Sequence, residues 1–267
     1  MVFDRRSRSG ICKKKENEKK KAMNLKSNEP QTAIVTGASS GVGLGITEEL
    51  LKRGYRVVGT ARSITKSTKL KASENLILVD GDIGKKETAI KVAAAAITNF
   101  KRIDLLVNNA GIYIPKPFTE YSPEDFELMI ATNVAGYFFL TQQVVAQMCK
   151  QKSGHIVSIS AATVDQPLAG GPMSLPVITK STMPAFSRAL AMEYVAYGIR
   201  ANTISPGIVD TPMHANDDHE LLKKLSPALR LVQISDLVDA LFYLESAHMV
   251  NGENIRIDGG AHAGTKW

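Results

Sequence analysis

The sequence predicts a single doubly wound α/β domain, with about seven parallel strands and helices on both faces of the sheet. Short apolar runs rich in valine and isoleucine alternate with longer segments of helical periodicity. Strands with so little polar alternation are typical of parallel sheets covered on both faces. A glycine-rich turn separates the first apolar run from the first helical segment. The repeated order of strand, turn and helix indicates parallel strands joined by right-handed crossovers.

Each element is placed by its own pattern. The apolar runs predict strands at Ala33–Val35, Arg56–Gly59, Leu76–Val79, Leu105–Val107, His155–Ile159, Ala201–Ile204 and Asn254–Ile257. Helical spacing predicts helices at Gly43–Arg53, Lys86–Phe100, Pro123–Gln151, Thr179–Tyr197 and Ser235–Leu244. Because no internal repeat or interior linker interrupts this order, residues 31–267 are expected to form one domain.

The composition is that of a globular protein with one substantial core. Of the 267 residues, 44% are hydrophobic and 22% are charged, which suits a single packed domain. No run approaches the roughly 18 consecutive apolar residues of a membrane-spanning helix, and no apolar run of a secretory signal follows the first basic residues. The two cysteines, Cys12 and Cys149, argue against a disulfide framework. We therefore expect a cytoplasmic protein without a membrane partner.

The net charge of +7 is concentrated near the start of the chain. Residues 1–30 hold seven lysines and three arginines against one aspartate and three glutamates, which gives +6 and leaves +1 for the rest. The clusters Lys13–Lys15 and Lys19–Lys21 would suit nucleic acid or an anionic surface. We favour a disordered, solvated extension, or a natural start at Met23, and do not expect a nucleic-acid partner.

A phosphate-binding loop is predicted where the first strand meets the first helix. Its glycines allow a tight turn, close approach of the backbone to a pyrophosphate, and close helix packing. The helix that follows directs free N–H groups and its positive dipole end at the phosphates. This placement predicts a Rossmann-type site for a nicotinamide dinucleotide. The predicted contacts in the loop are Gly37, Ser39, Ser40, Gly41, Val42 and Gly43.

The end of the second strand favours NADP(H) over NAD(H). An NAD site usually has a carboxylate about 20 residues beyond the glycines, bonded to the ribose 2′-hydroxyl. The segment from Val57 to Ser63 contains no carboxylate and offers Arg62 and Ser63 instead. The planar guanidinium of an arginine pairs well with a 2′-phosphate, although a solvated loop arginine would give the same sequence. No metal site is predicted.

In their spacing and order, these motifs resemble the classical members of the short-chain dehydrogenase/reductase family, over roughly Gln31 to Gly260. The resemblance covers the glycine motif and the closing run Ile257-Asp258-Gly259-Gly260. It implies further cofactor contacts after the third, fourth and sixth strands: Asp82 and Ile83 at the adenine, Asn109, Ala110 and Gly111 beside the central sheet, and Pro206, Gly207 and Thr211 at the nicotinamide carboxamide.

The family's catalytic set comprises a serine, a tyrosine, a lysine four residues after that tyrosine, and an asparagine. The lysine and the cofactor lower the tyrosine pKa so that its hydroxyl exchanges a proton with the substrate. Lys180, at the start of the predicted helix Thr179–Tyr197, matches the lysine. Asn133 matches the asparagine that anchors a water in the proton relay. Pro176 stands four residues before Lys180 and has no ionisable group, so the resemblance predicts that the tyrosine is replaced.

The serine of this set is displaced or missing. Ala161 takes its place in the most natural alignment, and Ser160 would point to the opposite face if the strand still alternates there. Thr163 is a further candidate, because the segment leading to Pro176 is slightly longer than usual. The candidate catalytic residues are therefore Lys180, Asn133, Ser160 and Thr163.

Two functions are compatible with this site. The first is an NADP(H)-dependent oxidoreductase acting on a carbonyl or alcohol substrate, since a lost general acid typically costs about 10²- to 10⁴-fold and does not abolish hydride chemistry that belongs to the cofactor. The second is a catalytically inactive NADP(H)-binding sensor or regulatory protein of the same fold. Lys180, Asn133 and Thr211 favour the enzyme. Replacement proton donors are Ser174, Thr163, Tyr113, Lys180 itself, or a water held by Asn133.

The sequence is less specific about substrate and assembly. The segment from Pro212 to Val232 is expected to roof the pocket. Met213, Leu221 and Leu222 either contact an apolar substrate or pack a lid helix. The resemblance also implies a homodimer or homotetramer built on the helices Pro123–Gln151 and Thr179–Tyr197.

Overall fold

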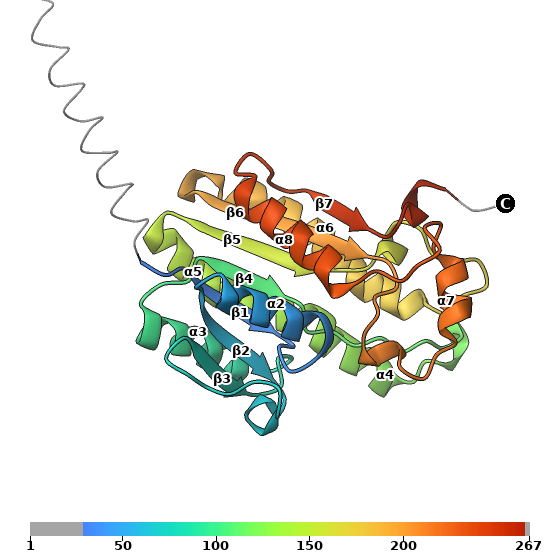
Figure 1. Ribbon diagram of the computed structural model, residues 1–267, viewed down its shortest axis with the longest axis horizontal. Helices are drawn as coiled ribbons and strands as arrows, with labels where there is room; N and C mark the ends of the chain where they lie inside the picture. Colours follow the sequence, from blue (N-terminus) through green and yellow to red (C-terminus); the bar gives the residue numbers. More distant parts are fainter. Residues whose placement is uncertain (1–28, 265–267) are drawn as a thin grey trace, which may run out of the picture.

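Residues 29–264 are described by the computed structural model, and within them seven strands form one parallel sheet (Figure 1). The strand order is β3-β2-β1-β4-β5-β6-β7, and every neighbouring pair is parallel. The strands are β1 (Thr32–Thr36), β2 (Arg56–Ala61), β3 (Leu76–Asp80), β4 (Leu105–Asn108), β5 (Gly154–Ile159), β6 (Ile199–Pro206) and β7 (Asn254–Ile257). The predicted fold class is confirmed. The predicted basic extension lies almost wholly outside the described residues.

Helices cover both faces of the sheet. The helices are α2 (Gly41–Lys52), α3 (Lys86–Phe100), α4 (Pro123–Ile130), α5 (Gly136–Gln151), α6 (Ser174–Glu193), α7 (His219–Leu225) and α8 (Ile234–Ser246). In β1, Ala33 and Val35 pack with α2 and α8, whereas Ile34 packs with α3 and α5 on the opposite face. This alternation of fully buried side chains is the reason why the strands read as continuous apolar runs.

Short helical turns complete the connections. They are Ile64–Lys66, Phe118–Glu120, Ala162–Val164, Val195–Tyr197, Pro212–His214 and Ala261–Ala263, together with a π-helical turn at Ala131–Ala135. The chain runs outward from β1 to β3 and then returns to β4 beside β1, so the strand order reverses between β1 and β4. In a doubly wound sheet, the ligand crevice lies outside the carboxyl ends of the strands at this reversal.

The predicted helix Pro123–Gln151 consists of α4 and α5 joined through the π-helical turn. Ser122 caps its start, because the Ser122 hydroxyl accepts from the Asp125 amide while the Asp125 carboxylate accepts from the Ser122 amide. By length and apolar composition alone the 29-residue run is long enough to cross a membrane. In this fold it is a core helix, since Leu140, Val144 and Met148 are fully buried against the neighbouring elements.

The start of α6 differs from the prediction. The helix begins at Ser174 rather than at Thr179, so Lys180 lies in its second turn and Pro176 lies in its first. A proline is tolerated there because the first backbone N–H groups of a helix have no intrahelical acceptor. A second proline, Pro184, lies inside the helix and cannot donate to the carbonyl four residues earlier, which belongs to Lys180.

Candidate active site

A cavity of about 1030 Å³ opens at the carboxyl ends of the strands, where the loops after β1 to β6 converge. Its volume is at the upper end of the range of small-molecule sites, roughly 300–1,000 Å³, which suits a dinucleotide together with a small substrate. Among residues 29–264, no group of three or more histidine, cysteine or acidic side chains is arranged to hold a metal ion.

The glycine loop is rigidly packed against the loop after β4. The Thr36 hydroxyl accepts from the backbone amides of Asn109 and Ala110, both at 2.9 Å, and the Asn109 side-chain amide donates to the Thr36 carbonyl at 2.8 Å. Gly37 and Gly41 have φ values of +66° and +53°, in the left-handed region that favours glycine. The β1 and β4 ends are thereby held together under the pocket.

The start of α2 suits a pyrophosphate. The Ser40 side chain makes no capping hydrogen bond, and the first turn of the helix has no acidic residue. Its first N–H groups are therefore available to an anion, with the positive end of the helix dipole behind them. Only the side chain of Thr211, at 3.5 Å, would meet a Cβ at Gly41, so this part of the cradle is open to a ligand. Of the predicted loop contacts, Gly37, Ser39, Ser40, Gly41 and Val42 line the cavity.

Gly43 has a packing role. A Cβ at Gly43 would lie 2.3 Å from the Gly37 carbonyl oxygen and 2.5 Å from Asn109 Nδ2. Both distances are far shorter than a van der Waals contact, so only glycine allows α2 to approach the loop this closely. Gly43 does not line the cavity, and its effect on a ligand is exerted through the shape of the loop.

The loops after β2 and β3 form one end of the cavity. Arg62 lines it with an exposed side chain and makes no hydrogen bond or ion pair with any other residue in the described range. Ser63 does not line the cavity; it begins the short helical turn Ile64–Lys66. Asp82 and Ile83 also line this end, and one Asp82 carboxylate oxygen accepts from the Gly84 amide at 3.0 Å.

Lys180 lies on the cavity wall between β5 and the loop after β4. Its ammonium donates to the Ile159 carbonyl at 3.2 Å, and a Cβ at Gly111 would lie 3.1 Å from Lys180 Nζ. A side chain at position 111 would therefore displace the ammonium. Burial lowers the pKa of Lys180 from its ordinary value of 10.5 to about 8, because a low-dielectric environment disfavours the charged form. Ala110, Gly111, Pro206, Gly207 and Thr211 line the same cavity.

Asn133 is fully buried in the π-helical turn and does not line the cavity. Its side chain pairs with the backbone of Ile112, accepting from the amide at 2.9 Å and donating to the carbonyl at 3.0 Å. It also donates to the Thr179 hydroxyl at 3.1 Å. Asn133 thus links the loop after β4 to the turn of α6 that carries Lys180. Asn133 therefore positions Lys180 indirectly, through its hydrogen bonds to Ile112 and Thr179.

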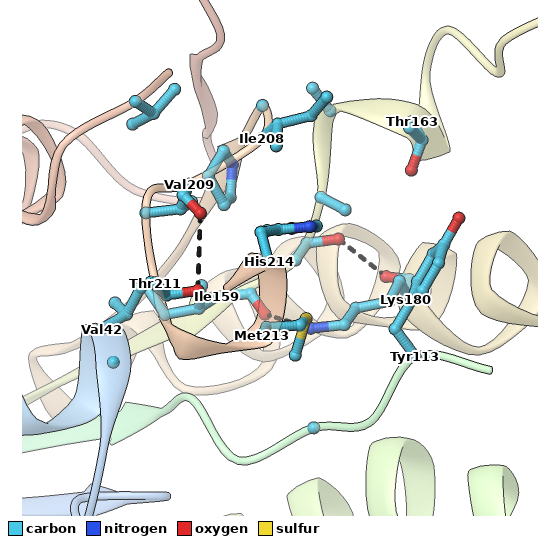
Figure 2. Close-up of a pocket in the computed structure, with 18 of the residues that line it drawn as sticks. Val42, Tyr113, Ile159, Thr163, Lys180, Ile208, Val209, Thr211, Met213 and His214 are labelled. Atoms are coloured by element: carbon cyan, nitrogen blue, oxygen red, sulfur yellow. Dashed lines mark hydrogen bonds between the residues drawn. The ribbon is translucent and has the colours of Figure 1, made fainter. Parts of the chain in front are cut away.

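The Ser160 hydroxyl has a structural partner. It donates to the Lys180 carbonyl at 2.9 Å, which is the carbonyl left without its helical donor by Pro184. The residue is only 3% exposed. Ser160, Ala161 and Thr163 all line the cavity, and Figure 2 shows the Thr163 hydroxyl directed into it. Of the two predicted hydroxyl candidates, Thr163 is therefore the one free to meet a substrate.

Three further positions bear on proton transfer. Pro176 is buried in the first turn of α6 and does not line the cavity, and neither does Ser174. Tyr113 does line it and is 40% exposed. Burial raises the pKa of the Tyr113 hydroxyl above its usual value, which favours the protonated form.

Sequence reasoning missed several contributors to the cavity, among them two titratable residues that pair with each other. His214 and Asp217, which follow Thr211 in the roofing segment, line it and pair with each other. They lie in a region without helical or strand periodicity, so only their spacing of three residues hinted at a contact. The buried Thr36 hydroxyl was also missed as the clamp between two strand ends, because such a role depends on which strand lies next to β1.

Comparison with known proteins identifies the family. Residues 31–221 match the model of the short chain dehydrogenase family. The chain belongs to this family. Acetoacetyl-CoA reductase of Acinetobacter sp. is 32% identical over 247 residues, covering 88% of this chain and 99% of that protein.

Solved structures of this family share the fold. The structure of ElxO with NADP bound matches with a TM-score of 0.80 and 26% identity, over 88% of this chain and 100% of that one. A 3-ketoacyl-(acyl-carrier-protein) reductase from Brucella melitensis, complexed with NADH, matches with a TM-score of 0.82 and 26% identity, over 88% and 99%. The prediction of an NAD(P)-dependent short-chain dehydrogenase/reductase with a small-molecule substrate is confirmed at this level.

Proposed function

We propose that this chain is an NADP(H)-dependent oxidoreductase of a carbonyl or alcohol substrate, with an atypical group for proton transfer. The observation that carries the proposal is that the glycine loop, Arg62 and Lys180 all line one cavity. When bound, the nicotinamide would supply or accept the hydride. The protein's own contribution is to bind and orient the two reactants, to exclude water and to move a proton.

The preference for NADP(H) rests on Arg62. Its guanidinium lines the cavity after β2, with no carboxylate between Val57 and Ser63 to hold a ribose 2′-hydroxyl. A fork of N–H donors without an internal partner in the described structure is suited to a 2′-phosphate. The NADP-bound ElxO structure supports this choice, whereas the NADH complex of the Brucella reductase shows that the fold alone does not decide it.

Pro176 takes the place of the family's tyrosine in this proposal. It has no proton to give, is buried in α6 and does not line the cavity. Lys180 orients the bound cofactor and, with its pKa near 8, is itself able to exchange a proton near neutral pH. Thr163 hydrogen-bonds the substrate oxygen, while Asn133 and Ser160 hold α6 in place.

A catalytically inactive NADP(H)-binding protein is the second candidate function. Two observations favour it: Pro176 at the tyrosine position, and the Ser160 hydroxyl committed to the Lys180 carbonyl. Both changes affect the chemistry and leave the cofactor cradle intact.

We further propose a homodimer or homotetramer located in the cytoplasm. Helices α4, α5 and α6 carry exposed apolar side chains that a partner copy would cover. These side chains are Phe126, Leu128, Phe138, Ile178 and Met192.

The test is NADPH oxidation by the purified protein with a panel of aldehydes, ketones and quinones, beside the variants Lys180→Ala and Pro176→Tyr. We expect turnover by the native chain that Lys180→Ala loses. If only Pro176→Tyr is active, the cavity lacks a proton donor and the binding function is correct. If none of the three binds NADPH, measured by its fluorescence, both functions are wrong.

A further inference from the structure

The roof of the cavity contains an imidazole paired with a carboxylate. His214 Nδ1 lies 2.7 Å from Asp217 Oδ2, and both residues line the cavity. The His214 side chain is 23% exposed, whereas that of Asp217 is 50% exposed. Figure 2 shows the His214 ring projecting from the roof into the cavity, toward the side that carries Thr163 and Lys180.

The backbone around His214 is fixed by its own turn. The His214 amide donates to the Thr211 carbonyl at 2.9 Å, and the His214 carbonyl accepts from the Asp217 amide at 3.1 Å. The ring of His219 contacts the same carbonyl at 2.9 Å through Nε2. His214 is therefore held one short helical turn beyond Thr211, the residue that the family resemblance places at the nicotinamide carboxamide.

The carboxylate fixes the tautomer of the ring. An ionised Asp217 accepts only, so Nδ1 of His214 carries the hydrogen that joins them. Nε2 has no hydrogen-bond partner among residues 29–264. A histidine oriented in this way by a carboxylate presents Nε2 for proton exchange.

We propose that His214 is the proton-transfer residue of this site and that Asp217 is its positioning residue; this inference rests on the proposed oxidoreductase function. In the reducing direction the reduced nicotinamide, when bound, would supply a hydride to the carbonyl carbon. The proton on His214 Nε2 would pass to the carbonyl oxygen, which uses the C=O π electron pair to form the new O–H bond. The products are the alcohol, the oxidised nicotinamide and neutral His214, which regains its proton from solvent. In the oxidising direction neutral Nε2 accepts the hydroxyl proton.

The other groups of the cavity are less suited to this role. Burial raises the pKa of Tyr113 and so disfavours its ionised form. The Lys180 ammonium is engaged by the Ile159 carbonyl, and Thr163 has an aliphatic hydroxyl. The other charged or titratable side chains lining the cavity are Arg62, Asp82, Asp218, Lys224, Arg230, Asp258 and His262, and the His219 ring contacts the His214 carbonyl.

The position of His214 is tested without turnover, by modification with diethyl pyrocarbonate followed by peptide mass spectrometry. We expect saturating NADP⁺ to slow modification of His214 several-fold, and 2′,5′-ADP, which lacks the nicotinamide half, to leave it unchanged. His248 is the matched control, because it is exposed and does not line the cavity. Equal rates for His214 with NADP⁺ and with 2′,5′-ADP would overturn the placement.

The role of His214 is tested by kinetics on whichever carbonyl of the panel the native chain reduces fastest. We expect His214→Gln to lower kcat by about a hundredfold or more, with the Kd of NADPH unchanged, and external imidazole to restore part of the rate in His214→Gly. Asp217→Asn lowers kcat, Asp217→Glu restores part of it, and His248→Gln has no effect.

Failure of this inference differs from failure of the proposed function. Native turnover that His214→Gln keeps would overturn the role of His214 and leave the oxidoreductase standing. If the native chain binds NADPH but reduces no carbonyl, both the role of His214 and the oxidoreductase function are wrong. A slow His214→Gln variant that imidazole does not rescue in His214→Gly would show a structural effect and overturn the inference.

Discussion

Ser160 and Pro184 form a coupled pair whose energetics are measurable. Pro184 has no N–H for the carbonyl of Lys180, and the Ser160 hydroxyl donates to that carbonyl instead, at 2.9 Å. Replacement of Ser160 by alanine removes the side-chain donor that takes the place of the missing Pro184 N–H at this carbonyl. In the variant Pro184→Ala the amide of residue 184 is available again, and an ordinary helical bond to Lys180 forms.

The expected magnitudes follow from this geometry. A buried carbonyl left without a donor costs about 1–3 kcal/mol, and Ser160 is 3% exposed. We therefore expect Ser160→Ala to lower the free energy of unfolding by about 2 kcal/mol in the native background. In the Pro184→Ala background the same substitution should cost less than about 0.5 kcal/mol, so that the two changes are coupled by more than about 1 kcal/mol.

The assay is urea unfolding of the four proteins of this double-mutant cycle, with NADPH-dependent turnover measured on each. Any packing loss caused by Pro184→Ala alone cancels in the cycle. Equal costs of Ser160→Ala in both backgrounds would refute the reasoning. A different result would show that Ser160 acts on the substrate: Ser160→Ala lowers kcat by about a hundredfold in both the native and the Pro184→Ala backgrounds, without any loss of stability.

Three further predictions concern the cofactor cradle. Arg62→Ala raises the Kd of NADPH by about 10- to 100-fold, the equivalent of one charge-assisted contact, and leaves the Kd of NADH unchanged. Fluorescence titration measures both constants, and an equal change for the two cofactors would contradict this prediction. Gly43→Ala abolishes NADPH binding in the same titration, because its Cβ would lie 2.3 Å from the Gly37 carbonyl oxygen, and unaltered binding would refute the packing role. Burial lowers the pKa of Lys180 to about 8, so between pH 8 and the ordinary pKa of 10.5 the unfolded chain binds the proton more tightly and the free energy of unfolding increases with pH. In urea unfolding without cofactor, the native chain should therefore gain on the order of 1 kcal/mol relative to Lys180→Met between pH 7.5 and 9.5. A difference between the two proteins that stays constant with pH would contradict this prediction.

The fold was predictable because parallel strands and their crossovers leave a strong imprint on a sequence. The predicted strand Asn254–Ile257 and helix Lys86–Phe100 have the observed bounds. Helix α6 was predicted to start at Thr179, five residues too late. Pro176 suggests a break in the chain, whereas the first turn of a helix accepts proline at little cost.

The cofactor end of the site was also accessible from sequence. Topology alone places the loops after consecutive parallel strands at one edge of a sheet, and this brings Arg62 and Gly37 to the same cavity. The proton-transfer end was less accessible. The direction of the Ser160 hydroxyl depends on Pro184, 24 positions later in the chain, and the pairing of His214 with Asp217 occurs in a segment without periodicity.

The central claim is that this chain moves hydride between NADPH and a carbonyl carbon. The most direct measurement is transfer of deuterium from NADPH fully deuterated at C4 of the nicotinamide to the product alcohol, followed by NMR and mass spectrometry. The predicted result with the native chain is deuterium on the carbinol carbon of the alcohol. With Lys180→Ala in place of the native chain, no such deuterium is expected. An alcohol without deuterium, or tight NADPH binding with no alcohol formed from any carbonyl of the panel, would contradict the account.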